Sequence, residues 1–195
     1  MTTAKPIKAW HFINADRRLG YGDGRKVIKG RTYKYKGKEP IELCKRGMHA
    51  SIKPLDALKY AKSNIICRVE LSGQIIKGDD KCVASERKVI QVFDAEKVLR
   101  KFACLCALDG LPENAPDIVV KYLKTQDESI RMEADRAANR AADRAACAAC
   151  AAYLAAYLAA DRAAYWAAYL AARNDMVKKQ NRRLSAMLRR EMEKC

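Results

Sequence analysis

The C-terminal part of the chain is an alanine-rich tract that contains no helix-breaking residue. No glycine or proline occurs between residues 125 and 195, and alanine has the highest helix propensity of any residue. Thr125 and Glu128 have the spacing of a capping box, in which each side chain accepts a hydrogen bond from the other residue's backbone N–H group. The sequence therefore predicts one long helix from Thr125, on the order of 100 Å long at about 1.5 Å per residue, with Asn174 as its weak point.

Units such as AAYL and AADR fill this tract between Ala137 and Asn174. The repeat of four residues is longer than a helical turn of about 3.6 residues, so successive alanine pairs shift in position around the helix. Because alanine side chains are small, another helix backbone can approach closely along this line of alanines. The tract also carries large apolar side chains, which soluble monomers rarely leave exposed together. We therefore expect a coiled coil or bundle with copies of the same chain, in preference to a helix folded back over the rest of the protein. The residues expected at this oligomerisation interface are Tyr153, Leu154, Tyr157, Leu158, Tyr165, Trp166, Tyr169 and Leu170.

The preceding residues alternate between strand and helix patterns, which predicts an α+β head with short mixed or antiparallel strands and two to three helices. Expected strands are 8–13, 31–36, 41–44, 48–51 and 65–71, with one or two more within 81–93; expected helices are 54–61, 95–108 and 116–123. Asp94 is the expected cap of the second helix. The predicted division is a basic α/β head at residues 1–124 and an oligomerisation helix with a basic end at residues 125–195.

The chain is strongly basic, with 39 lysines and arginines, 23 acidic residues and a formal net charge of +16. Such an excess favours a nucleic acid, an acidic protein surface or a membrane face, although it also serves solubility alone. Residues 17–46 contain eleven basic and three acidic residues, interleaved with Tyr21, Tyr33 and Tyr35. Basic residues attract phosphates and tyrosines stack on unpaired bases, but a solvated strand face with a flexible loop explains the pattern equally well.

A second basic stretch lies at residues 173–190, with seven basic residues and one acidic residue. Cations also stabilise the C-terminal end of a helix, so this stretch has two competing explanations. The candidate residues for binding nucleic acid or another anion in the two stretches are Arg17, Arg18, Arg25, Lys26, Lys29, Arg31, Lys34, Lys36, Lys38, Arg182 and Arg183.

The first residues, 1–8, contain no apolar leader segment, so the eight cysteines are expected to be reduced thiols in the host-cell cytoplasm. Cys147 and Cys150 form a C-x-x-C pair without a second pair or a histidine nearby, and we expect buried small residues there and no metal site. The longest uncharged run, residues 145–160, is too short for a membrane span. No cofactor motif occurs, and the two histidines, His11 and His49, sit in predicted strands, where a structural role is the more common one.

Most of the head resembles an uncharacterised family that is common in phage and prophage genomes. The resemblance covers about residues 8–94, through the segments 9–12, 44–51, 56–61, 69–73, 79–81 and 84–87. Members of that family often carry alanine-rich C-terminal helices. The resemblance implies a phage accessory protein and brings no established activity.

The head is also similar, more loosely, to ADP-ribosyltransferases of the poly(ADP-ribose) polymerase type. The similarity lies in an early strand with His11, the segment 47–51, a helix with Tyr60 and a following apolar strand. It implies that His11 holds the nicotinamide ribose, Tyr60 stacks on nicotinamide and Glu86 supplies the later glutamate. His49 stands where that family has a tyrosine, so the similarity also fits a fold that has lost the activity.

These observations predict a phage-type accessory protein that self-associates and binds an anionic partner, either nucleic acid or a host complex that handles nucleic acid. Inhibition of a host defence is one use of such a protein. An NAD-binding transferase, or its inactive descendant, and a purely structural scaffold are the alternatives.

Overall fold

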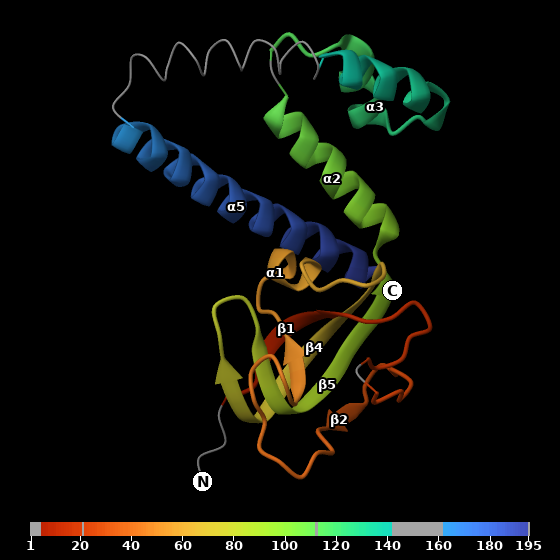
Figure 1. The fold of residues 1–195 in the computed structure, drawn as a ribbon. Coiled ribbons are helices and arrows are strands. Elements are labelled where there is room, and N and C mark those ends of the chain that lie inside the picture. The colour runs from red at the N-terminus through yellow and green to blue at the C-terminus, as the bar shows by residue number, and fades with distance from the viewer. Residues whose placement is uncertain (1–4, 21, 112, 142–161, 195) are drawn as a thin grey trace. The chain divides into compact units, whose positions relative to one another are not determined.

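The structure is a computed structural model, and it describes residues 5–20, 22–111, 113–141 and 162–194 (Figure 1). The contacts divide the chain into a first unit, Met1–Leu99 with Gln180–Cys195, and a second unit, Arg100–Lys179. The described residues contain an antiparallel sheet and about five helices. No helix in these ranges has the length and apolar character that crossing a membrane requires.

Five strands form the sheet of the first unit. They are β1 (Ile7–Phe12), β2 (Thr32–Lys34), β3 (Met48–Ala50), β4 (Ile65–Lys77) and β5 (Cys82–Asp94). Every pairing is antiparallel, in the order β1-β4-β5-β2, and β3 also pairs with β5. The long β4–β5 hairpin is the centre of the sheet, because it pairs with all three short strands. The predicted head strands are therefore confirmed at β1, β2, β3, β4 and β5.

The sheet curves until its two sides meet. Trp10 in β1 and Ser51, which follows β3, exchange two backbone hydrogen bonds of 2.7 and 2.9 Å. β3 pairs with β5, and β5 is separated from β1 by β4, so this bridge joins opposite sides of the sheet (Figure 1). The curvature brings side chains from β1, β3 and β5 around one space.

The concave face of the sheet carries the hydrophobic core. Ala9, Cys67, Val69 and Val89 lie in it and are almost fully buried. Side chains alternate between the two faces of a strand, and the register pairs His11 with Cys67 and Arg87 with Leu71. His11 and Arg87 therefore lie on the same face as the core.

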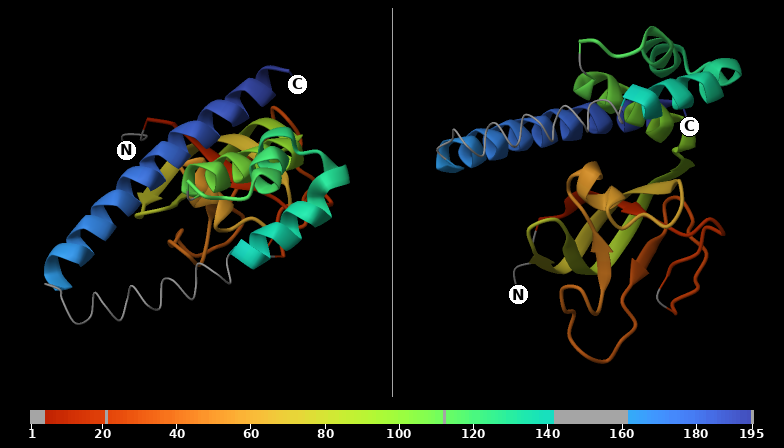
Figure 2. Two further views of the ribbon diagram at one scale, coloured as in Figure 1. Left: turned by 90° about the horizontal axis from the view of Figure 1, so that it is seen from above. Right: turned by 45° about the horizontal axis from the view of Figure 1, so that its top comes forward.

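The end of α5 (Arg162–Glu193) belongs to the first unit from Gln180 onward and lies beside α1 (Pro54–Leu58), as both Figure 1 and Figure 2 show. Lys53, which precedes α1, makes no capping hydrogen bond through its side chain. Asn181 provides the cap, because its Oδ1 accepts a hydrogen bond from the Leu55 backbone N–H at 3.1 Å. Residues 180–194 thus fold back over the head, which is the arrangement that the sequence favoured less.

The helices that follow the sheet begin with α2 (Glu96–Gly110) and α3 (Asp117–Thr125). α2 begins one residue later than predicted, and the Oδ1 of Asp94 accepts a hydrogen bond from the Glu96 N–H in its first turn at 2.8 Å. A 3-10 helix, η1 (Glu128–Ile130), and helical residues 131–141 come next.

The prediction that a helix begins at Thr125 is wrong. Thr125 is the last residue of α3, and Gln126 has a left-handed backbone with φ of 57°, which ends that helix. Asp127 caps η1, because its side chain accepts a hydrogen bond from Ser129 N–H at 2.9 Å. A carboxylate is a stronger acceptor than a hydroxyl, so the cap forms two residues after the predicted position.

The central residues of the alanine tract, 142–161, lie outside the described residues, and Tyr153, Leu154, Tyr157 and Leu158 lie with them. Tyr165, Trp166, Tyr169 and Leu170 lie within α5, and their side chains are not described. α5 passes Asn174 without a break. One continuous helix across the whole tract, and its packing in a coiled coil, stay predictions.

The strand predicted at residues 41–44 does not form. Glu42 and Arg46 instead make an isolated bridge around a turn in which Cys44 has a left-handed backbone with φ of 68°. β4 is also longer than predicted, because the strand does not end at the Ser72–Gly73 pair. A β-bulge with φ of +73° at Gly73 lets the strand continue. The bulge lets β4 and β5 remain paired up to their connecting turn.

Candidate anion-binding pocket

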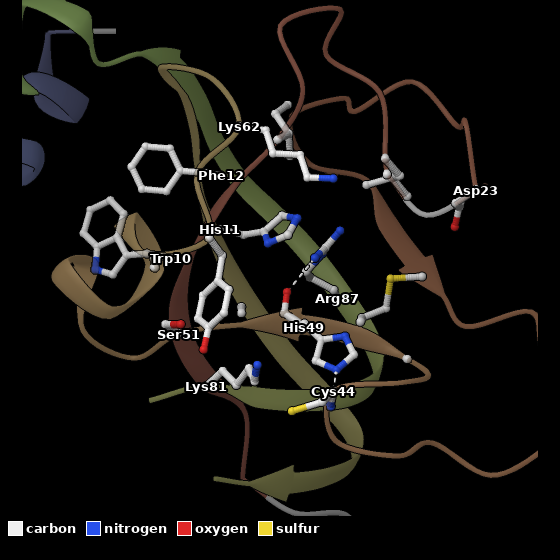
Figure 3. A pocket seen from close by; sticks show the side chains of 18 of the residues that line it. Trp10, His11, Phe12, Asp23, Cys44, His49, Ser51, Lys62, Lys81 and Arg87 are labelled. Carbon is white, nitrogen blue, oxygen red and sulfur yellow. Dashed lines mark hydrogen bonds between the residues drawn. The ribbon is translucent and has the colours of Figure 1, made fainter. Parts of the chain in front are cut away.

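A cavity of about 440 Å³ opens on the curved sheet of the first unit (Figure 3). Its wall consists of residues from β1, β3 and β5, the loops around residues 19–23 and 44–47, and the segment after α1. This volume is within the range of sites that bind small molecules. The polar side chains that line it include His11, Cys44, His49, Lys62, Lys81 and Arg87.

Arg87 is the most deeply buried charged residue of the pocket, with only 4% of its surface exposed. Its Nη1 donates a hydrogen bond of 2.7 Å to the backbone oxygen of His49, and its buried Nε has no partner (Figure 3). Among the described residues, no carboxylate lies within ion-pair distance of it. Burial lowers the pKa of Arg87 to about 10, so the side chain is still positively charged at neutral pH.

His11 in β1 lies close to Arg87 and is partly buried. Desolvation lowers its pKa well below the ordinary value of 6.5, and the positive charge of Arg87 and the nearby His49 lower it further. The His11 imidazole is therefore neutral at pH 7, and can donate one hydrogen bond and accept another.

His49 in β3 has an assigned tautomer. Its Nε2 accepts a hydrogen bond from the Cys44 N–H at 3.1 Å, so the proton of the neutral ring is on Nδ1. Burial is the main cause that lowers its pKa, with Lys81 and Arg87 adding to it, while a hydrogen bond with the Gly47 backbone opposes the shift. Like His11, His49 is neutral at pH 7.

Gly47 allows the loop before β3 to approach the sheet closely. Its φ is +122°, and a Cβ at this position would lie 2.5 Å from Cγ2 of Val83. Only glycine fits both the backbone conformation and the space. The close approach places His49, two residues later, at the wall of the pocket.

The charges that line the pocket are strongly unbalanced. Asp23 is the one acidic residue in the lining, and Arg25 already holds its carboxylate at 2.5 Å, which lowers the pKa of Asp23. The basic lining residues are Lys45, Arg46, Lys62, Lys81 and Arg87. Lys45 and Arg46 form ion pairs with glutamates outside the lining. The charge of Arg87, which has no carboxylate partner among the described residues, and that of Lys81 give the pocket a positive potential that favours an anionic ligand.

Tyr60 and Lys81 lie together at the pocket. The Lys81 Nζ is 4.3 Å from the centre of the Tyr60 ring, and the Tyr60 hydroxyl donates a hydrogen bond of 2.7 Å to Oδ2 of Asp80. This hydrogen bond is the main cause of the lowered pKa of Asp80. Tyr60 remains 46% exposed, so its ring is accessible to a ligand.

The structure brings together two of the three residues that the transferase resemblance implies. His11 and Tyr60 line the same pocket, whereas Glu86 does not. Glu86 pairs with Lys34 at 3.0 Å and accepts a hydrogen bond from the Ser72 hydroxyl at 3.3 Å. Because neighbouring residues of a strand point to opposite faces, the residue that β5 directs into the pocket is Arg87. The sequence signal for Arg87 was its even spacing from Val89 on the apolar face of β5.

Most of the basic residues between positions 17 and 38 are exposed, and two of them form ion pairs with acidic residues. Arg25 pairs with Asp23, and Lys34 pairs with Glu86. Arg182 is exposed, and Arg183 is partly buried. The exposed residues for which the described part of the chain provides no carboxylate partner are Arg17, Arg18, Lys26, Lys29, Arg31, Lys36 and Lys38.

Tyr33 cannot stack on a base, which the sequence suggested as one of its roles. It is a core residue with 1% of its surface exposed. Its hydroxyl donates to the Lys26 backbone oxygen at 2.6 Å and accepts from the Ile28 N–H at 2.9 Å. Tyr35 lines the pocket, and Tyr21 lies outside the described residues.

The described ranges contain no metal cluster, and burial strongly shifts the pKa of one of their cysteines. No group of three or more histidine, cysteine, aspartate or glutamate residues there has an arrangement suited to a metal. Burial raises the pKa of Cys67 to about 12, so its thiol stays protonated and unreactive. Cys147 and Cys150 lie outside the described residues.

Comparison with known families finds one match, to a domain of unknown function, DUF7666, over residues 7–101. The matched residues include the five strands and all residues that line the pocket. Neither the curated proteins nor the solved structures contain a significant match. The comparison assigns no activity to the matched residues.

Proposed function

We propose that this protein is a self-associating, phage-type accessory protein whose sheet domain binds nucleic acid. The observation that carries the proposal is the set of exposed cations between residues 17 and 38 that lack carboxylate partners. Cations that are not paired within the protein remain available for phosphates, and each phosphate contact releases bound counterions. Inhibition of a nucleic-acid-guided or nuclease defence of the host is a use that fits such binding.

Self-association through the alanine tract adds to this proposal. Several copies of a weak binding surface on one assembly raise the overall affinity without any new contact, provided that they can engage together. The aromatic and leucine residues between 153 and 170 are the proposed interface of a coiled coil or bundle.

The test is binding of a random single-stranded oligonucleotide, followed by fluorescence anisotropy over a series of salt concentrations. In the variant Lys26→Gln/Lys29→Gln/Arg31→Gln, we expect at least a tenfold loss of affinity at low salt. We also expect the slope of log K against log salt to fall by about two, because each lost contact with a single strand contributes about 0.7.

Lys97→Gln is the matched control, because Lys97 is exposed and lies outside the basic stretch. The proposal predicts that this variant binds like the unaltered protein. Absence of binding even at low salt would remove nucleic acid as the partner.

A second candidate is an NAD-binding protein related to ADP-ribosyltransferases. The observation in its favour is that His11 and Tyr60 line one pocket. Titration with NAD⁺ followed by calorimetry tests it, and we expect His11→Ala to abolish any binding heat. If NAD⁺ produces no binding heat, the resemblance to the transferases does not extend to an NAD-binding site.

A further inference from the structure

We propose that the pocket on the sheet is a binding site for a small organic phosphate, and that Arg87 is the residue that holds the phosphate group. This site is separate from the proposed nucleic-acid surface, since it lies inside the cavity and depends on different side chains. The inference therefore does not rest on the proposed function.

The first argument is the state of the Arg87 side chain. One edge of its guanidinium is used, because Nη1 donates to the backbone oxygen of His49. The buried Nε has no acceptor among the described residues. A buried donor without a partner and a buried charge without a counter-charge are both destabilising, so a structural arginine is normally paired with a carboxylate. An oxyanion in the cavity would supply both missing partners.

Arg46 provides an internal comparison. Its Nε is also buried without a partner, but its guanidinium forms ion pairs with Glu39 and Glu42. The charge of Arg46 is thus compensated within the protein. Arg87 is the pocket arginine whose charge is not compensated, and it lies where a ligand can reach it.

The second argument distinguishes a phosphate from a carboxylate. Lys81 lines the pocket together with Arg87, and the one acidic lining residue is already held by Arg25. A phosphate monoester carries close to two negative charges at pH 7 and several acceptor oxygens, whereas a carboxylate carries one charge. A planar guanidinium edge can donate two parallel hydrogen bonds to phosphate oxygens, and the neutral His11 ring next to it can donate another.

The third argument is size. A volume of about 440 Å³ exceeds what a phosphate group alone would fill. Leu19 and Met48 contribute apolar surface to the same wall, and the ring of Tyr60 is half exposed beside it. The pocket therefore suits a phosphate attached to an organic group that contacts apolar and aromatic side chains.

The test uses the full-length protein and inorganic phosphate as the probe. Two-dimensional ¹⁵N NMR of the arginine Nε–H groups is recorded while phosphate replaces chloride at constant ionic strength. The Arg87 signal is assigned by its absence from the Arg87→Lys spectrum. We expect this signal to shift progressively and reach saturation, because a phosphate oxygen becomes the acceptor of the Nε–H.

The matched control is Arg140→Lys, which replaces an exposed arginine outside both the pocket and the proposed nucleic-acid surface. This variant should keep the full response of Arg87 to phosphate. Thermal unfolding gives a second readout: phosphate should raise the melting temperature of the unaltered protein and of Arg140→Lys, and not that of Arg87→Lys. If Arg87→Lys does not fold, the Arg87 Nε–H signal is assigned through its side-chain connection to the Arg87 backbone resonances, and the titration of the unaltered protein decides the question.

Three outcomes would overturn the inference. If the Arg87 signal does not respond to phosphate, phosphate does not bind at the Arg87 Nε–H. An equal response to acetate would mean that the site does not distinguish a phosphate from a carboxylate. If phosphate raises the melting temperature of Arg87→Lys as much as that of the unaltered protein, the stabilising phosphate binds elsewhere.

Discussion

His11 and His49 make the stability of the first unit dependent on pH. Both have lowered pKa values in the folded protein, so they bind fewer protons than in the unfolded chain at pH values below about 6.5, the unfolded value. The unfolded state therefore gains stability as the pH falls through this range. We expect the free energy of unfolding to decrease below pH 6.5, by at most about 1.4 kcal/mol per pH unit for each histidine.

Urea unfolding between pH 5 and 8 measures this dependence. The variant His11→Gln should show a smaller decrease between pH 6.5 and 5, and the two proteins should behave alike between pH 7 and 8, where both histidines are neutral. The lowered pKa values of Asp23 and Asp80 affect stability only at more acidic pH. A variant with an unchanged acid slope would contradict the role given to His11.

The single residues of the pocket were only partly predictable. His11 and Tyr60 were candidates from their sequence context, and the structure brings them to one cavity. Arg87 was not a candidate, because its importance depends on the register of β5 and on the absence of a carboxylate nearby. Tyr33 was considered as a residue that stacks on bases, but it is buried because β2 directs it toward the core. Local sequence indicates the strand, and only the pairing decides which face is buried.

At the scale of elements, the end of α5 is an integral part of the first unit. Leu184 and Leu188 are fully buried, and Asn181 caps α1. We expect Leu184→Ala or Leu188→Ala to lower the free energy of unfolding by about 2–5 kcal/mol, the usual range for a buried leucine.

Urea unfolding followed by circular dichroism measures this loss, and Arg182→Ala is the control because Arg182 is exposed on the same helix. The expected change for the control is about 0.5 kcal/mol or less. If the leucine variants were as stable as the control, the C-terminal residues would not contribute to the unit that the contacts define.

Elements were predicted better than their ends. The β4–β5 hairpin, α2 and its cap Asp94 follow from β-branched runs and a capping residue. The bulges in β4 and the position of the cap at Asp127 depend on competition between neighbouring hydrogen-bonding groups. Such competition involves small energy differences, and sequence patterns alone do not decide it.

At the scale of the whole molecule, the proposed self-association predicts a mass above that of one chain. We expect light scattering of the full chain to give a multiple of the monomer mass. Alanine at Tyr153, Tyr157, Tyr165 and Tyr169 together should reduce that mass, because these substitutions remove four of the five aromatic side chains of the proposed interface.

Phenylalanine at the same four positions is the matched control, and should preserve the assembly. Substitution in the full chain is preferable to truncation at Lys124, since truncation also removes the buried Leu184 and Leu188. A monomeric full chain in dilute buffer would contradict the proposed assembly and the gain in affinity that depends on it.

The first unit is discontinuous, because residues 100–179 separate its two segments in the sequence. During synthesis, the ribosome makes the whole intervening stretch before it makes Leu184 and Leu188. Until then, the surface of residues 1–99 that residues 180–194 later bury is exposed to water. A chaperone that binds apolar surfaces would meet this intermediate, and premature termination anywhere between residues 100 and 179 would leave it permanently uncovered and exposed to proteolysis.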